Sequence, residues 1–531
     1  MDIRQKTISL IDALKSVCRS YGLGNDGNEY KIITQVFLYK FLDDKLSHEL
    51  GKQGGAPRTE HEYRELLGRL PADVPRLFPG QRVRDLWEQR SRPDFDRLFD
   101  NAMTAISDQN GDVFFTRTAQ QTRVPLFERI TPFVMDGSQR APFAAAVVEK
   151  LNGFSFEETF SCGYDFFADI FEYLIKDYNT AGGGKYAEYY TPHSVAGIMA
   201  RLLADGAPDG FLECYDPSAG TGTLLMALAH QLGTRRCGIF AQDISQRSSK
   251  MLKLNLILNG LTDSLDNAVQ GDTLLTPFHR ETDGTTLRRF DYVASNPPFR
   301  MDFSDAREQL AAMPGRFWAG VPKVPAKKKE SMAVYTCFLQ HVINSMKTGG
   351  RAAVVVPTGF VMAKNGVENA ILRHLTDAHL IYGCISMPSN LFASTGTNVS
   401  VLFLDNSGKA REAVLINAAE LGEDYRDNGI QRRRLRSEEA ERIISAFRRR
   451  ENIEDFSIVV PHERIKARNY SLSAGQYFGV KQTENALSHE EFTRELGCCA
   501  GELRRLSEES AALQEDIFRQ LARLGIREES E

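Results

Sequence analysis

The stretch FDYVASNPPFRMDF, from Phe290 to Phe303, places oxygen acceptors and an aromatic ring directly after an apolar run. Asn296 offers a side-chain amide oxygen, and the backbone carbonyl of Pro297 follows it. Proline lacks an amide hydrogen, so Pro297 and Pro298 do not extend a central strand. Two oxygen acceptors held close together suit an amine that donates both of its hydrogens. Accepting both draws the nitrogen lone pair out of conjugation and makes the amine a better nucleophile.

Phe299 adds an aromatic face beside these acceptors. Stacking of a base on such a face contributes about 1–3 kcal/mol in proteins that bind single strands. A base in a duplex reaches a site of this kind only when it is flipped out of the helix, at a cost of a few kcal/mol. The stretch therefore indicates a site for the amino group of a flipped base. The alternative is that the prolines only terminate a strand.

A second group of candidate residues lies upstream, in and after the segment DPSAGTGTLL. Asp216 ends an apolar run there, and Gly220 and Gly222 let the backbone approach a ligand at a helix N-terminus. The turn is not a Walker loop, because the pattern G-x-x-x-x-G-K-[ST] is absent. Asp243 and Asp272 end the next two runs, where carboxylates can accept bonds from ribose hydroxyls and an adenine amino group. Each acid alone is a common cap or turn residue, but three at successive strand ends indicate a nucleoside site.

The elements that position these residues follow from the hydrophobic pattern. After residue 210, short apolar runs alternate with helical patterns, which is typical of a doubly wound, mostly parallel sheet. The last two runs are joined without a helix, which predicts that the last strand is antiparallel. The expected strands are 211–216, 237–242, 267–270, 291–295, 351–357, 380–387 and 398–404, with helices at 223–232 and 245–259 among those between them.

The flanking regions have a different pattern. The first 150 residues are predicted to be mainly helical, most clearly at 3–18 and 30–50. The chain beyond residue 409 is charged and predicted to be helical, and 489–525 has the periodicity of an amphipathic helix. We therefore predict a helical N-terminal domain over 1–150, a catalytic domain over 151–410, a charged extension over 411–480 and an amphipathic helical tail over 481–531.

Length and composition narrow the classes of protein to which the chain can belong. The chain has 531 residues, a length that favours two to four domains. Of these residues, 42% are hydrophobic and 25% are charged, which is typical of globular proteins. We expect a cytoplasmic protein, since no stretch approaches the roughly 18 apolar residues of a membrane span and no secretory signal is evident. Eight cysteines without a C-x-x-C pair predict a reducing compartment and no metal site. The net charge of −5 neither requires nor excludes nucleic acid.

Taken in order, DPSAGTGTLL, AQD, GDTLL and NPPF resemble the cofactor-binding and catalytic motifs of DNA amino-methyltransferases. Longer segments, including KYAEYYTPHSVAGIMARLL, GGRAAVVVPTGF and MPSNLFASTGTNVSVLFL, resemble the modification subunit of type I restriction-modification systems. The resemblance covers roughly residues 5–480. It implies an α/β, Rossmann-like methyltransferase sheet that uses S-adenosylmethionine, with a helical N-terminal domain and a helical tail. Asn in the first position of N-P-P-F points to N6 of adenine.

The resemblance also implies roles for individual residues. The catalytic motif carries over to Asn296, Pro297, Pro298 and Phe299. The residues implied to bind S-adenosylmethionine are Tyr190, Thr191, Pro192, Asp216, Ser218, Gly220, Thr221, Gly222, Asp243 and Asp272. Within that set, Asp243 is implied at the ribose and Asp272 at the adenine ring. No metal is implied.

The activity implied is methyl transfer from S-adenosylmethionine to N6 of adenine in double-stranded DNA, by base flipping and direct displacement. The partners implied are DNA, a specificity subunit that reads the sequence and joins two modification subunits, and in some assemblies a restriction subunit. The amphipathic tail is expected to dock on the specificity subunit, or else to fold on its own domain. Two alternatives stay open, namely methylation of RNA adenine or protein glutamine, and a non-catalytic subunit that clamps DNA.

Overall fold

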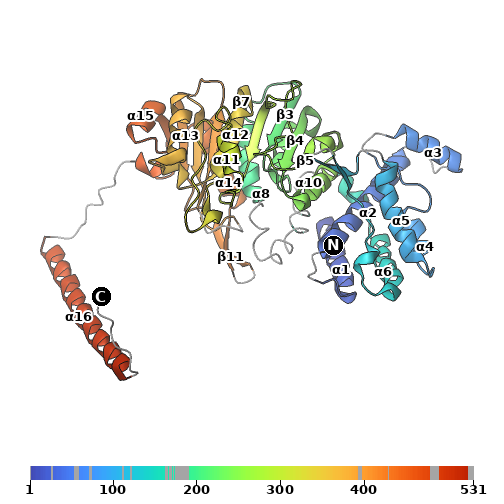
Figure 1. Cartoon of the computed structure of the whole chain (residues 1–531), viewed down its shortest axis with the longest axis horizontal. Helices are drawn as coiled ribbons and strands as arrows, with labels where there is room; N and C mark the ends of the chain where they lie inside the picture. The colour runs from blue at the N-terminus through green and yellow to red at the C-terminus, as the bar shows by residue number, and fades with distance from the viewer. Residues whose placement is uncertain are drawn as a thin grey trace. The chain divides into compact units, whose positions relative to one another are not determined.

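A computed structural model describes most of the chain (Figure 1). The described residues are 2–24, 28–52, 59–70, 74–110, 113–119, 122–161, 166, 170, 173, 191–392, 398–427, 430–478 and 489–523. They divide into two compact units, Met1–Phe478 and Gly479–Glu531. In the described part, no helix combines the length and apolar character that a membrane crossing requires.

The first two helices of the first unit are the ones that hydrophobic periodicity predicts most clearly, at 3–18 and 30–50. Both predictions are confirmed. The α-helices among the described residues of this unit are α1 (Ile3–Ser20), α2 (Glu29–Lys52), α3 (Glu60–Arg69), α4 (Val83–Glu88), α5 (Phe95–Gln109), α6 (Arg140–Asn152), α8 (His193–Leu203), α9 (Thr223–Leu232), α10 (Gln246–Leu258), α11 (Arg307–Ala311), α12 (Tyr335–Asn344), α13 (Gly366–Asp377), α14 (Ser437–Arg449) and α15 (His462–Ala467). The predicted helices 223–232 and 245–259 are α9 and α10, so the alternation of helix and strand is confirmed.

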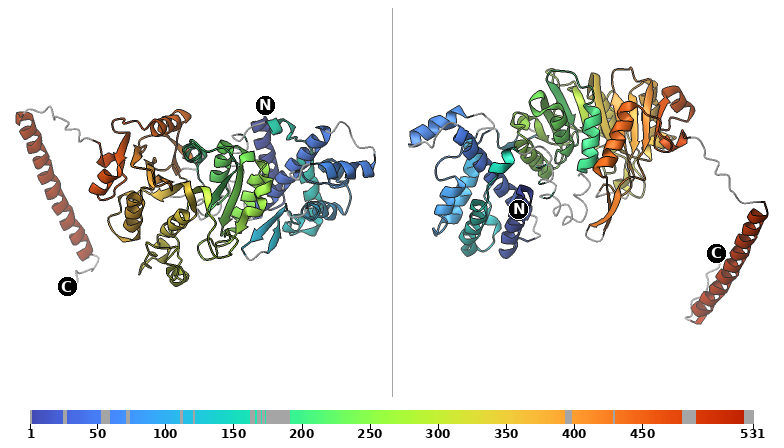
Figure 2. Two further views of the ribbon diagram at one scale, coloured as in Figure 1. Left: turned by 90° about the horizontal axis from the view of Figure 1, so that it is seen from above. Right: turned by 180° about the vertical axis from the view of Figure 1, so that it is seen from behind.

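One large sheet forms the centre of this unit (Figures 1 and 2). Its spatial order is β13-β10-β8-β9-β7-β6-β3-β4-β5-β1-β2. The strands are β1 (Phe115–Thr118), β2 (Arg123–Pro125), β3 (Leu212–Asp216), β4 (Cys237–Asp243), β5 (Ala268–Gln270), β6 (Phe290–Ser295), β7 (Met346–Pro357), β8 (Ile381–Ser386), β9 (Val399–Asp405), β10 (Glu412–Asn417) and β13 (Ser457–Pro461). A separate hairpin pairs β11 (Glu423–Asp427) with β12 (Ile430–Arg434).

The strand directions confirm the predicted fold class. β3, β4, β5, β6 and β7 are joined by parallel pairings. β9 is antiparallel to both of its neighbours, β7 and β8, as the missing helix between the last two runs predicts. The chain leaves β3 toward β4 on one side, and β6 lies on the other, so the order reverses between β3 and β6. In open α/β sheets a ligand binds at the carboxyl ends of the strands beside such a reversal.

The structure also contains strands that the sequence pattern does not predict. β1 and β2 come from the region predicted to be mainly helical, and β1 extends the sheet by pairing with β5. Beyond residue 409 the prediction of a helical chain is wrong in part, because β10 and β13 add two strands to the opposite edge. These runs are short and flanked by charges, so they show little of the alternation that identifies a strand. Pairing with an existing sheet edge stabilises them instead.

Two apolar layers cover the two faces of the sheet. Along β7, Ala353 and Val355 pack on the face that also holds α8, α9, α10 and α14. The alternate residues Ala352, Val354 and Val356 pack on the face with α12 and α13. Successive side chains of a strand point to opposite faces, so a continuous apolar run produces this double burial.

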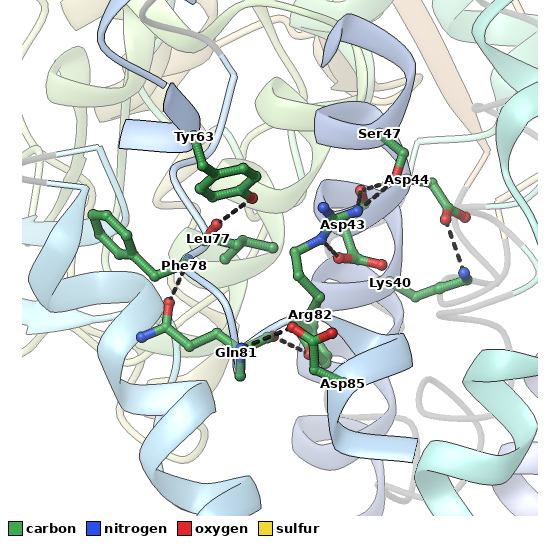
Figure 3. A network of polar contacts seen from close by, with 12 residues as sticks. Lys40, Asp43, Asp44, Ser47, Tyr63, Leu77, Phe78, Gln81, Arg82 and Asp85 are labelled. Atoms are coloured by element: carbon green, nitrogen blue, oxygen red, sulfur yellow. Dashed lines mark hydrogen bonds and ion pairs between the residues drawn. The ribbon is translucent and has the colours of Figure 1, made fainter. Parts of the chain in front are cut away.

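Buried charges hold the N-terminal helices together (Figure 3). Lys40 Nζ on α2 donates to Asp44 Oδ1 at 2.8 Å, and the second oxygen of Asp44 accepts the amide of Phe156 at 2.7 Å. Arg82, which precedes α4, forms an ion pair with Asp43, which also lies on α2. Burial raises the pKa of Asp44, and the charge of Lys40 opposes that rise. Lys40, Asp43 and Asp44 thus each have a partner of opposite charge, as burial requires.

The second unit contains a single long described helix, α16 (His489–Arg523). It lies within the predicted tail, and its length and amphipathic pattern confirm the predicted helix at about 489–525. Its described side chains are almost all exposed, including several large apolar ones.

Candidate functional site

The structure brings most of the predicted site residues to the carboxyl ends of β3, β4, β5 and β6. There they border two cavities that share one residue, Pro298. Thr191 and Pro192 lie just before α8 and are described, whereas Tyr190 lies outside the described residues. The two cavities are called here the β3–β5 cavity and the Asn296 cavity.

The glycine turn after β3 requires the glycines that it contains. Gly220 has a φ of 52° and Gly222 a φ of 84°, both in the left-handed region that favours glycine. A Cβ added at Gly222 would lie 2.3 Å from Leu252 Cδ1, so α10 packs directly against the turn. The amide of Gly220 donates to Asp243 Oδ2 at 2.8 Å, which ties the turn to the end of β4.

The three predicted carboxylates occupy different positions. Asp243 and Asp272 line the β3–β5 cavity, whereas Asp216 lies beneath its wall and is 1% exposed. Asp243 accepts the amides of Gly220 and Ser245, each at 2.8 Å. Burial raises its pKa, and these two bonds lower it. Asp243 therefore holds the glycine turn as well as facing the cavity.

Asp216 links the glycine turn to β6. Its Oδ1 accepts the amide of Ser218 at 2.9 Å, and the Ser218 hydroxyl lies 2.7 Å from that of Ser295. Ser295 immediately precedes Asn296, so this chain of contacts sets the distance between the two strand ends. Ser295 is not among the residues predicted from the sequence, although its place next to Asn296 could have suggested it.

The burial of Asp216 also leads us to expect that the stability of the folded protein depends on pH. Burial raises its pKa from 3.8 to about 7, and repulsion by Asp243 adds to the rise. The folded state therefore binds this proton more tightly than the unfolded state, and the resulting stabilisation, complete below about pH 4, is lost as the pH rises through about 7. We expect the thermal midpoint of the free protein to fall by several degrees between about pH 5 and pH 8, and Asp216→Asn to reduce that fall. Differential scanning fluorimetry measures both, and equal slopes for the two proteins would contradict the assignment.

The β3–β5 cavity has a volume of about 300 Å³ and a mixed lining. Polar groups come from Ser218, Thr221, Asp243 and Asp272. Apolar groups come from Ile244, which is 56% exposed, and from a small buried cluster. The cluster residues that line the cavity are Leu274, Phe303, Leu310 and Phe338. A cavity lined by both carboxylates and apolar side chains suits a ligand that is cationic and partly apolar. The lining therefore fits S-adenosylmethionine.

Asn296 lies directly after β6 with its side-chain amide held in one orientation. Its Nδ2 donates to the hydroxyl of Thr191 at 3.1 Å, and Thr191 is 4% exposed. With the nitrogen engaged there, Oδ1 is directed away from Thr191 and can accept a bond from a ligand. Thr191 therefore orients the amide, a contact that joins residues 105 positions apart in the sequence.

The Asn296 cavity has a volume of about 700 Å³ and an aromatic lining. Phe299 meets Tyr335 edge-on, with ring centroids 6.3 Å apart, and Tyr335 meets Phe360 at 6.0 Å. Phe392 lines the same cavity and was not selected from the sequence, although it lies in a segment that carries the family resemblance. Arg300 and Lys364 add positive charge to the lining. The cavity combines an oriented acceptor, aromatic rings and cations, as an unpaired nucleotide requires.

Residues 162–486 match the family model described as N-6 DNA Methylase. A curated relative, the type I restriction enzyme MpnII methylase subunit of Mycoplasma pneumoniae, is 25% identical over 330 residues, which are 61% of this chain and 59% of that protein. The MjaVIII methylase subunit of Methanocaldococcus jannaschii is 23% identical over 88% of this chain and 78% of its own length. The matched part spans less than two thirds of the first two curated relatives, at 59% and 63%.

A solved structure shares the fold. It is the methyltransferase subunit of a type I restriction-modification system from Streptococcus thermophilus, with a TM-score of 0.71 and 20% sequence identity. The match covers 89% of this chain and 99% of that chain. The resemblance noted from the motifs is therefore confirmed at the level of family and fold.

Proposed function

Since the chain belongs to the N-6 DNA methylase family, we propose that it transfers a methyl group from S-adenosylmethionine to N6 of adenine in double-stranded DNA, as the modification subunit of a type I restriction-modification complex. The observation that carries the proposal is the oriented amide of Asn296, two residues before Pro298, which borders both cavities. An amine held in one cavity would thus lie beside a cofactor held in the other.

The residues that would hold the cofactor line the β3–β5 cavity. Asp243 and Asp272 offer carboxylate oxygens to the hydroxyl and amino groups of an adenosine, and Ile244 offers an apolar face. When bound, S-adenosylmethionine supplies a methyl group on a sulfonium, which is an activated electrophile. The glycine turn, held by Asp243, closes the cavity toward β3.

The residues of the Asn296 cavity would position the base. Asn296 Oδ1 and the carbonyl of Pro297 accept the two hydrogens of N6, and this raises the nucleophilicity of the nitrogen. Phe299 and Phe392 provide aromatic faces for a flipped base. The transfer needs no covalent bond to the protein, so most of the acceleration comes from holding the two reactants in line.

A lysine-containing segment supports contact with DNA. Lys323 and the run 327–329 are exposed, and Ser331 and Ala333, a few residues further on, line the Asn296 cavity. Positive charges at the rim of a base-binding cavity would contact the phosphates on either side of a flipped nucleotide. Such contacts make the affinity for DNA depend on salt.

The test of this function is a methylation assay on DNA that contains the recognition site. We expect N6-methyladenine, detected by mass spectrometry of digested DNA, when the chain is combined with the specificity subunit of its own system. Product with RNA or protein as the only acceptor would instead support the other methyltransferase substrates. Tight DNA binding without any product in the complete mixture would support a non-catalytic clamp and overturn the proposal.

Helix α16 supports docking on a partner helix. Its exposed apolar residues are separated by three, four or seven residues, as in a coiled-coil seam, at Phe492, Leu496, Leu503, Leu506, Leu513 and Ile517. An acidic residue flanks the seam at every seventh position, at Glu495, Glu502, Glu509 and Asp516. We infer that α16 docks on a helix of the specificity subunit whose facing edge is basic.

Charge reversal tests this docking surface. Glu495→Lys with Glu502→Lys should weaken binding to the specificity subunit by about tenfold at low salt, because attraction along one edge becomes repulsion. Glu508→Lys with Glu515→Lys makes the same change in net charge on the face away from the seam and is the matched control. Isothermal titration calorimetry measures both pairs. Equal losses in the two pairs would rule out the acidic edge as the contact.

A further inference from the structure

We propose that Arg316 is a positioning residue that fixes the wall of the β3–β5 cavity against which the adenosine end of the cofactor would bind. The inference rests on the proposed function, because it assumes that this cavity holds S-adenosylmethionine. Arg316 lies between α11 and α12, at the start of the lysine-containing segment, and it was assigned no role from the sequence. Its guanidinium joins the turn after β5, which lines the cavity, to His341 of α12.

The turn after β5 lines the cavity from Asp272 to Leu275. Asp272 Oδ1 accepts the amides of Leu274 and Leu275 at 2.8 and 3.0 Å, so one carboxylate oxygen organises the N–H side of the turn. The hydroxyl of Thr273 donates to the carbonyl of Pro217 at 2.7 Å, which joins this turn to the glycine turn. The position of Asp272 thus depends on the geometry of the whole turn.

Arg316 holds the carbonyl side of the same turn. Its Nη2 donates to the oxygen of Thr273 at 2.7 Å and its Nη1 to that of Leu274 at 2.6 Å. The planar guanidinium presents these donors in a fixed fork, so both carbonyls must point toward one plane. With Asp272 on one side and Arg316 on the other, the turn is bonded on both sides.

The guanidinium is itself anchored to β3. Nη2 of Arg316 lies 2.8 Å from Nδ1 of His341, and Nε2 of His341 lies 3.1 Å from the hydroxyl of Tyr215. Because Nδ1 accepts from a guanidinium, the ring proton is on Nε2, which donates to Tyr215. Tyr215 directly precedes Asp216, and both Tyr215 and His341 are almost completely buried. Burial and the charge of Arg316 lower the pKa of His341, which keeps the ring neutral.

The contacts of the Arg316 guanidinium differ from an ordinary ion pair, because the guanidinium is charged and the groups that it contacts are neutral. In the described part of the chain, each hydrogen-bond partner of its guanidinium is neutral, being either a backbone carbonyl or the imidazole of His341. Burial lowers its pKa to about 10, so the guanidinium stays charged at neutral pH. Attraction to Asp272 is among the interactions that oppose this fall. Arg316 therefore acts on Asp272 through the turn geometry and also through its charge.

The experiment compares ligand affinity with catalytic rate in Arg316→Lys and Arg316→Met. Calorimetry with S-adenosylhomocysteine and with methylthioadenosine, which lacks the amino-acid end, should show affinities lowered by about 10- to 100-fold for both ligands, as expected for two lost charge-assisted bonds. The value of kcat with saturating cofactor should change by less than about threefold, since Asn296 is untouched. A drop in kcat with unchanged affinities would overturn the proposal.

Arg280 provides the matched control. It also donates to two backbone carbonyls, those of Pro277 and Thr285, but neither of these two residues lines the β3–β5 cavity, whereas Thr273 and Leu274 both do. Arg280→Lys should leave both affinities within about threefold of the wild type. An equal loss in Arg280→Lys and Arg316→Lys would mean that loss of any such arginine loosens the structure, and would overturn the proposal.

A double-mutant cycle separates positioning from general stability. If Arg316 acts through Asp272, then Asp272→Asn and Arg316→Lys together should weaken binding by clearly less than the product of the two single effects. Strictly multiplicative effects would overturn the proposal. Arg316→Lys retains the charge and much of the volume, so it keeps the test usable if Arg316→Met does not fold. A wild-type protein that binds neither ligand would refute the proposed function itself, whereas an unaffected Arg316→Lys refutes only this inference.

Discussion

Asn296→Ala should reduce methyl transfer by about 10²- to 10³-fold or more while leaving the affinity for S-adenosylhomocysteine unchanged. Oδ1 of this residue is the acceptor that the amine loses, and the remaining acceptor, the carbonyl of Pro297, cannot draw both hydrogens alone. The cofactor would be held by the β3–β5 cavity, which Asn296 does not line. Single-turnover methylation and calorimetry with S-adenosylhomocysteine measure the two quantities separately.

Two further variants test whether the loss of methyl transfer comes from removal of the oriented oxygen, Oδ1 of Asn296. Asn365→Ala removes another asparagine from the lining of the same cavity and should change the rate by less than about tenfold. Thr191→Val removes the partner that orients the amide and should give an intermediate loss of about tenfold, because the amide can then rotate. Near-normal turnover in Asn296→Ala would remove this residue from the catalytic role. A loss equal to that of Asn365→Ala would assign the effect to the cavity in general.

Gly222→Ala should lower the affinity for S-adenosylhomocysteine by about tenfold or more and should also destabilise the protein. An alanine at a φ of 84° pays about 1–2 kcal/mol for the left-handed conformation. Its Cβ would also lie 2.3 Å from Leu252 Cδ1, so the turn or α10 must move, at about 1–3 kcal/mol. Since Thr221 and Met251 both line the β3–β5 cavity, either movement changes its wall.

Gly260→Ala is the matched control for that variant. Gly260 also has a positive φ, of 71°, but an added Cβ there meets nothing within 4 Å. It should therefore show the conformational cost in the thermal midpoint without the loss of ligand affinity. In the double variant Gly222→Ala with Leu252→Ala, the contact is relieved and part of the affinity should return. Normal affinity in Gly222→Ala would show that the turn tolerates a side chain and does not define the cavity.

Several features of this protein follow from short stretches of sequence. The alternation of apolar runs with helical patterns predicts the sheet and its helices, because strand and helix periodicities are local properties. The strand-end placement of Asp216, Asp243 and Asp272 predicts that they gather at one edge, since the carboxyl ends of parallel strands coincide there. The missing helix before β9 predicts an antiparallel strand, and the structure has one.

Other features depend on sheet edges. The β1 residues pair with β5, and β10 with β8, at the two sides of the sheet. Whether so short a run becomes a strand depends on an open edge with unpaired backbone groups, which is a property of the assembled sheet. The pattern of residues 115–118 or 412–417 alone contains no sign of that edge.

The sequence by itself determined which chemical groups are present and in which order the chain reaches them: the amide of Asn296, the ring of Phe299 and the carboxylates at the strand ends. Tertiary structure alone decided which residues orient those groups. Thr191 meets Asn296 across 105 positions of the chain, and Arg316 meets Thr273 across 43. Contacts at such separations follow from the order of strands in the sheet, and local hydrophobic periodicity does not encode that order.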